Sequence, residues 1–218
     1  MTDEMTPGSE YNDFSGWPKI WLKAITSPSE ATFEEIAESP SATMGNAFVW
    51  VVLTAIIATV FSVMSSLLNE YVYGVTQGGG MGIGLVACIT PIASIIGILV
   101  FTGLSNGVAK MMGGTGTFDK LLFTTAAYSL PIALLTGAAS LIPVVDIIGA
   151  CLLGIYSLVL MVIAVKAVHQ FEWGQAVAAG IAPTILLICI AAICVMGSVA
   201  LLGPAIEGSF QEIIDSLE

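Results

Sequence analysis

The chain has 218 residues, of which 56% are hydrophobic and only 10% are charged, and its mean hydropathy is +0.96. This composition excludes an ordinary water-soluble domain and indicates a chain that is embedded for most of its length in a lipid bilayer. The net charge of -11 and the absence of arginine exclude nucleic acid as a partner, because no basic surface exists to displace the counterions of phosphates.

The first 44 residues are polar and acidic and are predicted to form a cytoplasmic N-terminal segment. Residues 1–16 lack the apolar side chains that a core needs, so we expect them to be disordered. Apolar residues then recur at helical spacing beside Lys19 and Lys23, which predicts a short helix in the inner headgroup layer. These apolar residues are Trp17, Ile20, Trp21, Ala24 and Ile25.

A second N-terminal helix is indicated by Ser27, Pro28 and Glu30, which form a capping box with proline at the first helical position, and Pro40 ends this helix. Two interpretations are open: the helix is a docking surface whose Phe33, Glu34 and Ile36 face a partner, or its acidic face is simply solvated while the helix lies along the membrane. The apolar face carries Phe33, Ile36 and Ala37, and the opposite face carries Glu34, Glu35 and Glu38.

Five uncharged apolar runs follow, each long enough to cross a bilayer, which takes about 20 residues of helix. Pro143 and Asp146 separate the third run from the fourth and predict a tight hairpin, with Asp146 as the N-cap of the second helix. The runs cover residues 45–68, 83–109, 121–142, 147–165 and 176–202, so residues 45–203 are predicted to form a five-span membrane domain.

The lysines indicate how these spans are oriented. If the spans alternate in direction, all five lysines fall on one side of the membrane, which by the positive-inside rule places the N-terminus in the cytoplasm and the C-terminus outside. Ser209 and Glu212 form another capping box and predict an amphipathic helix in an extracytoplasmic tail, residues 204–218. The lysines are Lys19, Lys23, Lys110, Lys120 and Lys166.

The predicted fold class is therefore an all-α integral membrane protein. It is a bundle of five transmembrane helices with a short amphipathic N-terminal cytoplasmic helix and an amphipathic C-terminal helix outside. The expected location is the plasma or inner membrane.

Residues 113–135 hold a glycine-rich loop and a phenylalanine, followed by a span with an aromatic-x-x-proline step. This stretch resembles the signature of the Yip-one (Ypt/Rab-interacting protein) domain family. Residues 17–39 are similar to the entry region of that family, a tryptophan-bearing segment and a proline before a Phe-containing acidic helix. The motif positions in this chain are Gly113, Gly114, Gly116, Phe118, Tyr128 and Pro131.

The resemblance implies an integral membrane protein without known catalysis, whose eukaryotic members work in membrane traffic with small GTPases. The Asp-Leu-Tyr-Gly-Pro entry motif of the eukaryotic branch is absent here, and the shorter N-terminal region looks like the prokaryotic branch. The GTPase-partner function is therefore not carried over to this chain.

Proline residues within the spans predict local breaks in helical hydrogen bonding. Pro131 leaves the carbonyl of residue 127 without its usual donor and is expected to kink the third span. Tyr128, one turn earlier, needs a hydrogen-bond partner at this depth, which is either a neighbouring helix or a solute. Pro91 and Pro183 interrupt the second and fifth spans in the same way, and three kinked helices would enclose a cavity.

One short motif suggests catalysis. Residues 103–107 match the Gly-x-Ser-x-Gly pattern around Ser105, and His169, the only histidine, is expected at the same membrane face. That pattern works on a strand-to-helix turn, however, and here it falls in a predicted membrane helix, where Gly103 and Gly107 are more simply a packing pair. No cofactor or metal site is predicted, because the four cysteines lie within the spans without metal-ligand spacing.

The sequence thus favours a non-enzymatic membrane protein that organises membranes or serves as a scaffold for protein or lipid. The expected partners are the lipid bilayer and another membrane or cytoplasmic protein. A small-solute permease is the alternative, and a polar cavity that reaches Tyr128 would favour it, although no ionisable group lies deep in a span as ion-coupled carriers usually require. An intramembrane serine hydrolase is the third interpretation.

Overall fold

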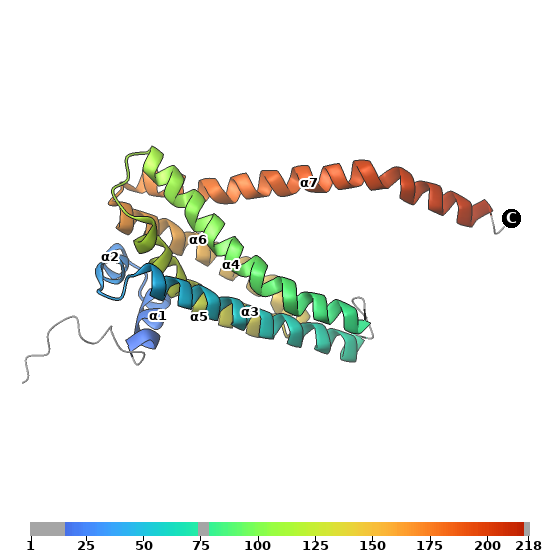
Figure 1. The fold of residues 1–218 in the computed structure, drawn as a ribbon, viewed down its shortest axis with the longest axis horizontal. Helices are drawn as coiled ribbons and strands as arrows, with labels where there is room; N and C mark the ends of the chain where they lie inside the picture. The colour runs from blue at the N-terminus through green and yellow to red at the C-terminus, as the bar shows by residue number, and fades with distance from the viewer. Residues whose placement is uncertain (1–15, 74–78, 216–218) are drawn as a thin grey trace, which may run out of the picture. The chain divides into compact units, whose positions relative to one another are not determined.

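The computed structural model describes residues 16–73 and 79–215, and within these ranges all regular structure is helical (Figure 1). The disorder predicted for residues 1–16 concerns a segment that, except for its last residue, lies outside the described ranges. The helices are α1 (Trp17–Thr26), α2 (Glu30–Glu38), α3 (Met44–Tyr73), α4 (Gly79–Met111), α5 (Phe118–Ala139), α6 (Pro143–His169) and α7 (Trp173–Asp215).

Five of these helices are long and apolar enough to cross a membrane, which confirms the predicted helical membrane bundle. Large apolar side chains are exposed along them at helical spacing, as on α4 at Leu85, Ile89, Ile92 and Ile96. Such a surface is stable in lipid and not in water. The five segments are Met44–Val72, Gly82–Met111, Phe118–Ala139, Val144–His169 and Trp173–Ser198.

The chain divides into two compact units, residues 1–181 and residues 182–218. The first unit contains α1 to α6 and the first turns of α7, and the second contains the rest of α7. The second unit departs from the prediction, because α7 continues to Asp215 and no separate helix begins at Ser209. A capping box in the sequence favours a helix start but does not require one. Pro204 removes only one backbone hydrogen bond of the helix. The predicted amphipathic face of this tail depends on side chains outside the described ones.

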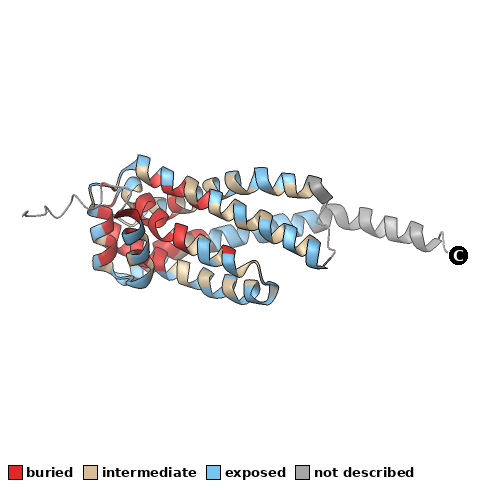
Figure 2. Ribbon diagram, turned by 90° about the horizontal axis from the view of Figure 1, so that it is seen from below, coloured by how far each residue is buried: buried red, intermediate tan, exposed pale blue. Residues whose placement is uncertain are grey.

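The core of the first unit lies at one end of the bundle, which we call the cap end (Figure 2). It consists of α1, α2, the first turns of α3 and α5, and the last turns of α4 and α6. The largest fully buried side chains gather there, among them Phe33, Trp50, Phe123, Leu160 and Met161.

Helix α1 packs against the bundle through an aromatic cluster. Trp17, Ile20 and Ala24 are buried on its inner side, and the Trp17 ring meets Trp50 of α3 edge-on with centroids 5.4 Å apart. Trp50 in turn stacks on Phe123 of α5 at 4.4 Å. The sequence placed this helix in the headgroup layer, but its apolar face is covered by protein, because aromatic rings from three elements can bury more area together than each could at an interface.

Helix α2 begins two residues later than predicted. Its N-cap is Ser29, whose hydroxyl accepts the Thr32 backbone N–H at 3.2 Å, and not Ser27. Ser27 instead ends α1, where its N–H donates to the carbonyl of Lys23 at 3.1 Å. Because the two helices are separated by so few residues, only Ser29 is free to adopt the extended N-cap conformation.

Helix α6, in contrast to α2, begins earlier than predicted. Pro143 occupies its first turn and Ile142 is the N-cap, so Asp146 lies inside the helix. Proline fits this place because its fixed φ suits the first helical position and its missing N–H has no helical acceptor there. Asp146 remains favourable in the first turn, close to the positive end of the helix dipole.

Candidate functional site

The glycine-rich loop of the family motif begins as the C-terminal cap of α4. Gly113 has a φ of +89°, which glycine adopts without strain, and its N–H donates to Lys110 at 3.1 Å. The N–H of Gly114 donates to Ala109 at 2.9 Å, which completes a Schellman motif. The first motif glycine therefore turns the chain sharply away from α4.

The next two glycines allow the loop to touch the end of α6. A Cβ on Gly114 would lie 2.5 Å from Nδ1 of His169, and a Cβ on Gly116 would lie 2.4 Å from the carbonyl oxygen of Val168. Neither distance is compatible with a side chain, so the loop can lie against α6 only with glycine at these positions. Thr115, between them, donates to the carbonyl of His169 at 3.5 Å.

Helix α6 also ends at a residue with a left-handed conformation, but this residue is not a glycine. Gln170 adopts a left-handed conformation with a φ of 54°, and the N–H of Phe171 donates to the carbonyl of Lys166 at 3.1 Å. The Phe171 ring then stacks on His169, with centroids 5.6 Å apart. These contacts hold the α6–α7 turn beside the glycine loop.

Helix α2 covers this region with its apolar face inward. Phe33 is fully buried and meets the Tyr128 ring edge-on at 6.2 Å, and Ile36 and Ala37 are buried beside it. The docking surface predicted from Phe33 and Ile36 is therefore wrong for these two residues, because the bundle itself covers them. Glu34 and Glu38 are the partly or fully exposed members of the acidic face that remain nearest to the glycine loop.

An ion pair fixes the first turn of α2. The Lys166 ammonium lies 2.5 Å from a carboxylate oxygen of Glu30 and 5.3 Å from the centre of the Trp173 ring. The Lys166 side chain is only 10% exposed, whereas that of Glu30 is 40% exposed. Lys166 thus brings together α2, α6 and the start of α7.

We expect the Glu30→Gln replacement to lower the free energy of unfolding by about 1–3 kcal/mol, because it leaves a largely buried ammonium without a carboxylate. The loss stays below that for a fully buried pair, since Glu30 is partly solvated. Glu35→Gln is the matched control: the Glu35–Lys23 pair is exposed on both sides and should contribute about 0–1 kcal/mol. Unfolding in mixed micelles measures both, and equal losses would contradict this account.

These elements enclose a small cleft, which we call the cap cleft, of about 150 Å³. Carboxylates of α2 lie on one side, and on the other are the glycine loop, the Lys120 side chain and the left-handed turn. Such a lining offers hydrogen-bond acceptors to a peptide or to a basic side chain. The lining residues are Glu34, Ala37, Glu38, Thr115, Gly116, Thr117, Lys120, Ala167, Val168 and Gln170.

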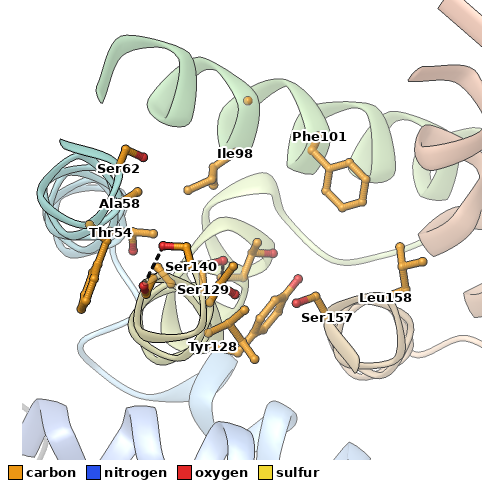
Figure 3. A pocket seen from close by; sticks show the side chains of 17 residues that line it. Thr54, Ala58, Ser62, Ile98, Phe101, Tyr128, Ser129, Ser140, Ser157 and Leu158 are labelled. Carbon is orange, nitrogen blue, oxygen red and sulfur yellow. Dashed lines mark hydrogen bonds between the residues drawn. The ribbon is translucent and has the colours of Figure 1, made fainter. Parts of the chain in front are cut away.

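A larger cavity of about 530 Å³ lies among the spans (Figure 3). Figure 3 shows it between Thr54, Ala58 and Ser62 of α3, Ile98 and Phe101 of α4, Tyr128 and Ser129 of α5, the α5 C-cap Ser140, and Ser157 and Leu158 of α6. Tyr128 is buried and its hydroxyl donates to the sulfur of Met161 on α6 at 3.3 Å. This confirms that the tyrosine has a hydrogen-bond partner on a neighbouring helix.

The cavity ends towards the cap end. It follows α5 from Ser140 down to Thr125 and Tyr128, and beyond that level the stacked rings of Trp50 and Phe123 fill the core. Helix α4 continues through Pro91 and helix α5 continues through Pro131 without interruption. Both helices line the cavity. The kinks predicted at these prolines remain a prediction.

Ser105 and His169 do not form a catalytic pair. Ser105 lies within α4, far from any strand-to-helix turn, and it is fully buried. Its hydroxyl and both ring nitrogens of His169 lack a hydrogen-bond partner in the described part of the chain, so the histidine does not activate the serine. The structure thus removes the one nucleophile–base pair that the sequence suggested.

Gly103 and Gly107, predicted to be a packing pair, do not approach another helix of the described chain closely. A Cβ on Gly107 would meet no atom within 4 Å, and one on Gly103 would be in ordinary contact with Phe118 at 4.0 Å. Close approaches occur instead at Gly137, where a Cβ would lie 2.3 Å from the Phe61 ring, and at Gly180, where it would lie 2.9 Å from Val162. Gly107 is exposed on the outer side of α4, so no other helix of the described chain packs against it.

The fold and site define a helical integral membrane protein with five spans and an N-terminal pair of helices docked on one end of the bundle. Residues 22–196 match the family model of the Yip1 domain, and the chain therefore belongs to the Yip1 domain family. No curated protein and no solved structure matches the chain. The match covers α2 to α6 completely, and so includes the glycine loop and the whole lining of the cap cleft.

Proposed function

We propose that this protein is a non-enzymatic scaffold of the membrane, and that it binds another protein through the cap cleft. The observation that supports this most strongly is the convergence at the cleft of two separate features, the acidic side of α2 and the glycine loop of the family motif. Both are held rigidly, α2 by its buried Phe33 and the loop by its contact with Val168. A preformed surface loses little conformational entropy on binding.

The cap end faces the cytoplasm in this proposal. All five lysines lie in elements of the cap end or in the turns that border it, and positive charge is retained in the cytoplasm. With an odd number of spans, the end of α7 is then on the outer side of a plasma or inner membrane.

The partner is expected to present a basic segment, because Glu34 and Glu38 carry two of the charges at the cleft and the chain as a whole is strongly acidic. The double replacement Glu34→Lys and Glu38→Lys should abolish recovery of a stoichiometric partner in a cross-linking pull-down from native membranes. Glu172→Lys is the matched control, since Glu172 is exposed on the neighbouring turn and does not line the cleft. Equal recovery from both variants would refute a role for the cleft.

A permease for a neutral solute is the second candidate, and the hydroxyl-bearing cavity at Tyr128 is the observation that favours it. The stack of Trp50 on Phe123 closes this cavity towards the cap end, so transport needs a second conformation. Uptake of small polyols into proteoliposomes tests this candidate: flux above that of protein-free vesicles supports it, and equal flux rules it out for these solutes.

A further inference from the structure

The cavity among the spans has a particular hydrogen-bonding character. Five of the hydroxyls that line it already donate their single proton within the protein. Thr54, Ser129 and Ser140 donate to backbone carbonyls three or four residues earlier at 2.7–2.9 Å. Thr125 and Tyr128 donate to the Met161 sulfur at 3.8 and 3.3 Å. Because a hydroxyl has one proton and two lone pairs, these oxygens can only accept from a ligand.

The uncharged character of the described lining further restricts the chemical class of the ligand. None of the described residues that line the cavity is an Asp, Glu, Lys or His. Apart from three further hydroxyl residues, Ser62, Thr136 and Ser157, the rest of the lining is glycine, aliphatic or aromatic. A carboxylate or a phosphate would have to lose its water there without meeting a cation, which costs several kcal/mol at this depth. The cavity therefore favours an uncharged ligand that donates a hydrogen bond and has a large apolar part.

We propose that this cavity binds a neutral bilayer lipid with a free hydroxyl group, of the diacylglycerol type. Its volume of about 530 Å³ lies within the range of small-molecule sites, about 300–1,000 Å³, so it can take the alcohol and part of a chain. The ligand comes from the bilayer, since every lining residue belongs to α3, α4, α5 or α6 or, for Ser140, to the C-cap of α5, and the stack of Trp50 on Phe123 separates the cavity from the cap end. The proposal is independent of the cap cleft.

Gly97 offers a direct way to fill the cavity. It lines the cavity from α4, and a Cβ placed on it would meet no atom within 4 Å. A Cβ is therefore accommodated at this position, and we expect the ring of a phenylalanine there to occupy space in the cavity. Gly154 on α6 is the matched control, because it also has open space around its Cα but does not line the cavity.

The experiment uses the full chain in phosphatidylcholine vesicles that contain a photoactivatable diacylglycerol or, in parallel, a photoactivatable phosphatidylcholine with the same acyl chain. After irradiation, mass spectrometry measures adducts on α4 and α5. We expect several-fold more adduct from the diacylglycerol, competition by unlabelled diacylglycerol, and a several-fold loss of adduct in Gly97→Phe but not in Gly154→Phe.

Two outcomes would overturn the proposal. Equal labelling by the two lipids would mean that ordinary annular lipid contacts the helices, and undiminished diacylglycerol labelling in a folded Gly97→Phe protein would place the lipid elsewhere. Ser129→Ala provides a test that does not depend on the folding of the phenylalanine variant. It removes one acceptor and fills no space, and it should reduce the preference for diacylglycerol over phosphatidylcholine. A preference equal to that of the wild type would contradict the assignment.

Discussion

Replacement of Phe33 by alanine is expected to lower the free energy of unfolding by about 3–5 kcal/mol, the range for a large aromatic side chain removed from a core. The Phe33 ring has no exposed area and meets Tyr128 edge-on at 6.2 Å, so its removal leaves a hole between α2 and α5. The neighbouring groups are held by the spans and can collapse only partly into this hole. Unfolding in mixed micelles, followed by tryptophan fluorescence, measures the loss.

The control for Phe33 is Glu38→Ala on the same helix. Glu38 is exposed, and surface replacements usually change stability by less than about 0.5 kcal/mol. A loss in Phe33→Ala no greater than that in Glu38→Ala would mean that α2 is not docked on the bundle. In that case Phe33 and Ile36 would again be available to a partner, as the sequence first suggested.

Replacement of Gly116 by alanine should be the next most damaging change, with a loss of about 1–3 kcal/mol, as for overpacking elsewhere. The added Cβ would lie 2.4 Å from the carbonyl oxygen of Val168 and 2.8 Å from its carbonyl carbon. These are backbone atoms at the end of α6 and cannot rotate away as a side chain could. The loop must therefore move off α6, which widens the cap cleft and should also weaken binding of the partner.

Gly107→Ala provides a control of the same chemistry with the opposite expected sign. Gly107 is exposed in the interior of α4, and an added Cβ meets nothing within 4 Å. Alanine in a helix interior is more stable than glycine by about 0.5–1 kcal/mol, so this variant should be as stable as the wild type or slightly more stable. Equal destabilisation in both glycine variants would show that the loop does not depend on its contact with Val168.

Hydropathy alone predicted the five spans, because the hydrocarbon thickness imposes both their length and their lack of charge. The capping residues and the helical spacing of apolar residues also predicted α1 and α2. The sequence could not predict whether lipid or protein covers their apolar faces, since side chains such as Trp17 and Phe33 are equally suited to both. The same ambiguity led to Gly103 and Gly107: spacing marks glycines that permit close packing, but only the three-dimensional arrangement shows that Gly137 and Gly180 are the ones in contact.

The cap cleft was predictable in parts and not as a whole. The acidic side of α2 and the loop after Gly113 each had a sequence signal, the first as part of a possible docking helix and the second as a family motif. Their convergence depends on the end of α6, where Gln170 adopts a left-handed conformation that no sequence pattern marks. The Lys166–Glu30 pair was also missed, because its members are separated by 136 residues and Lys166 served in the sequence only as a sign of orientation.

The most direct test of the proposed function is site-specific photo-crosslinking in native membranes, with a photoreactive amino acid at residue 38 in the cap cleft and, separately, at residue 22. Leu22 is 58% exposed on α1, at the same end of the bundle but outside the cleft. We predict a discrete protein adduct from residue 38 that is lost when Glu34 is replaced by lysine, and no such adduct from residue 22. The same adducts from both positions, or none from residue 38, would contradict the cap cleft as the binding surface.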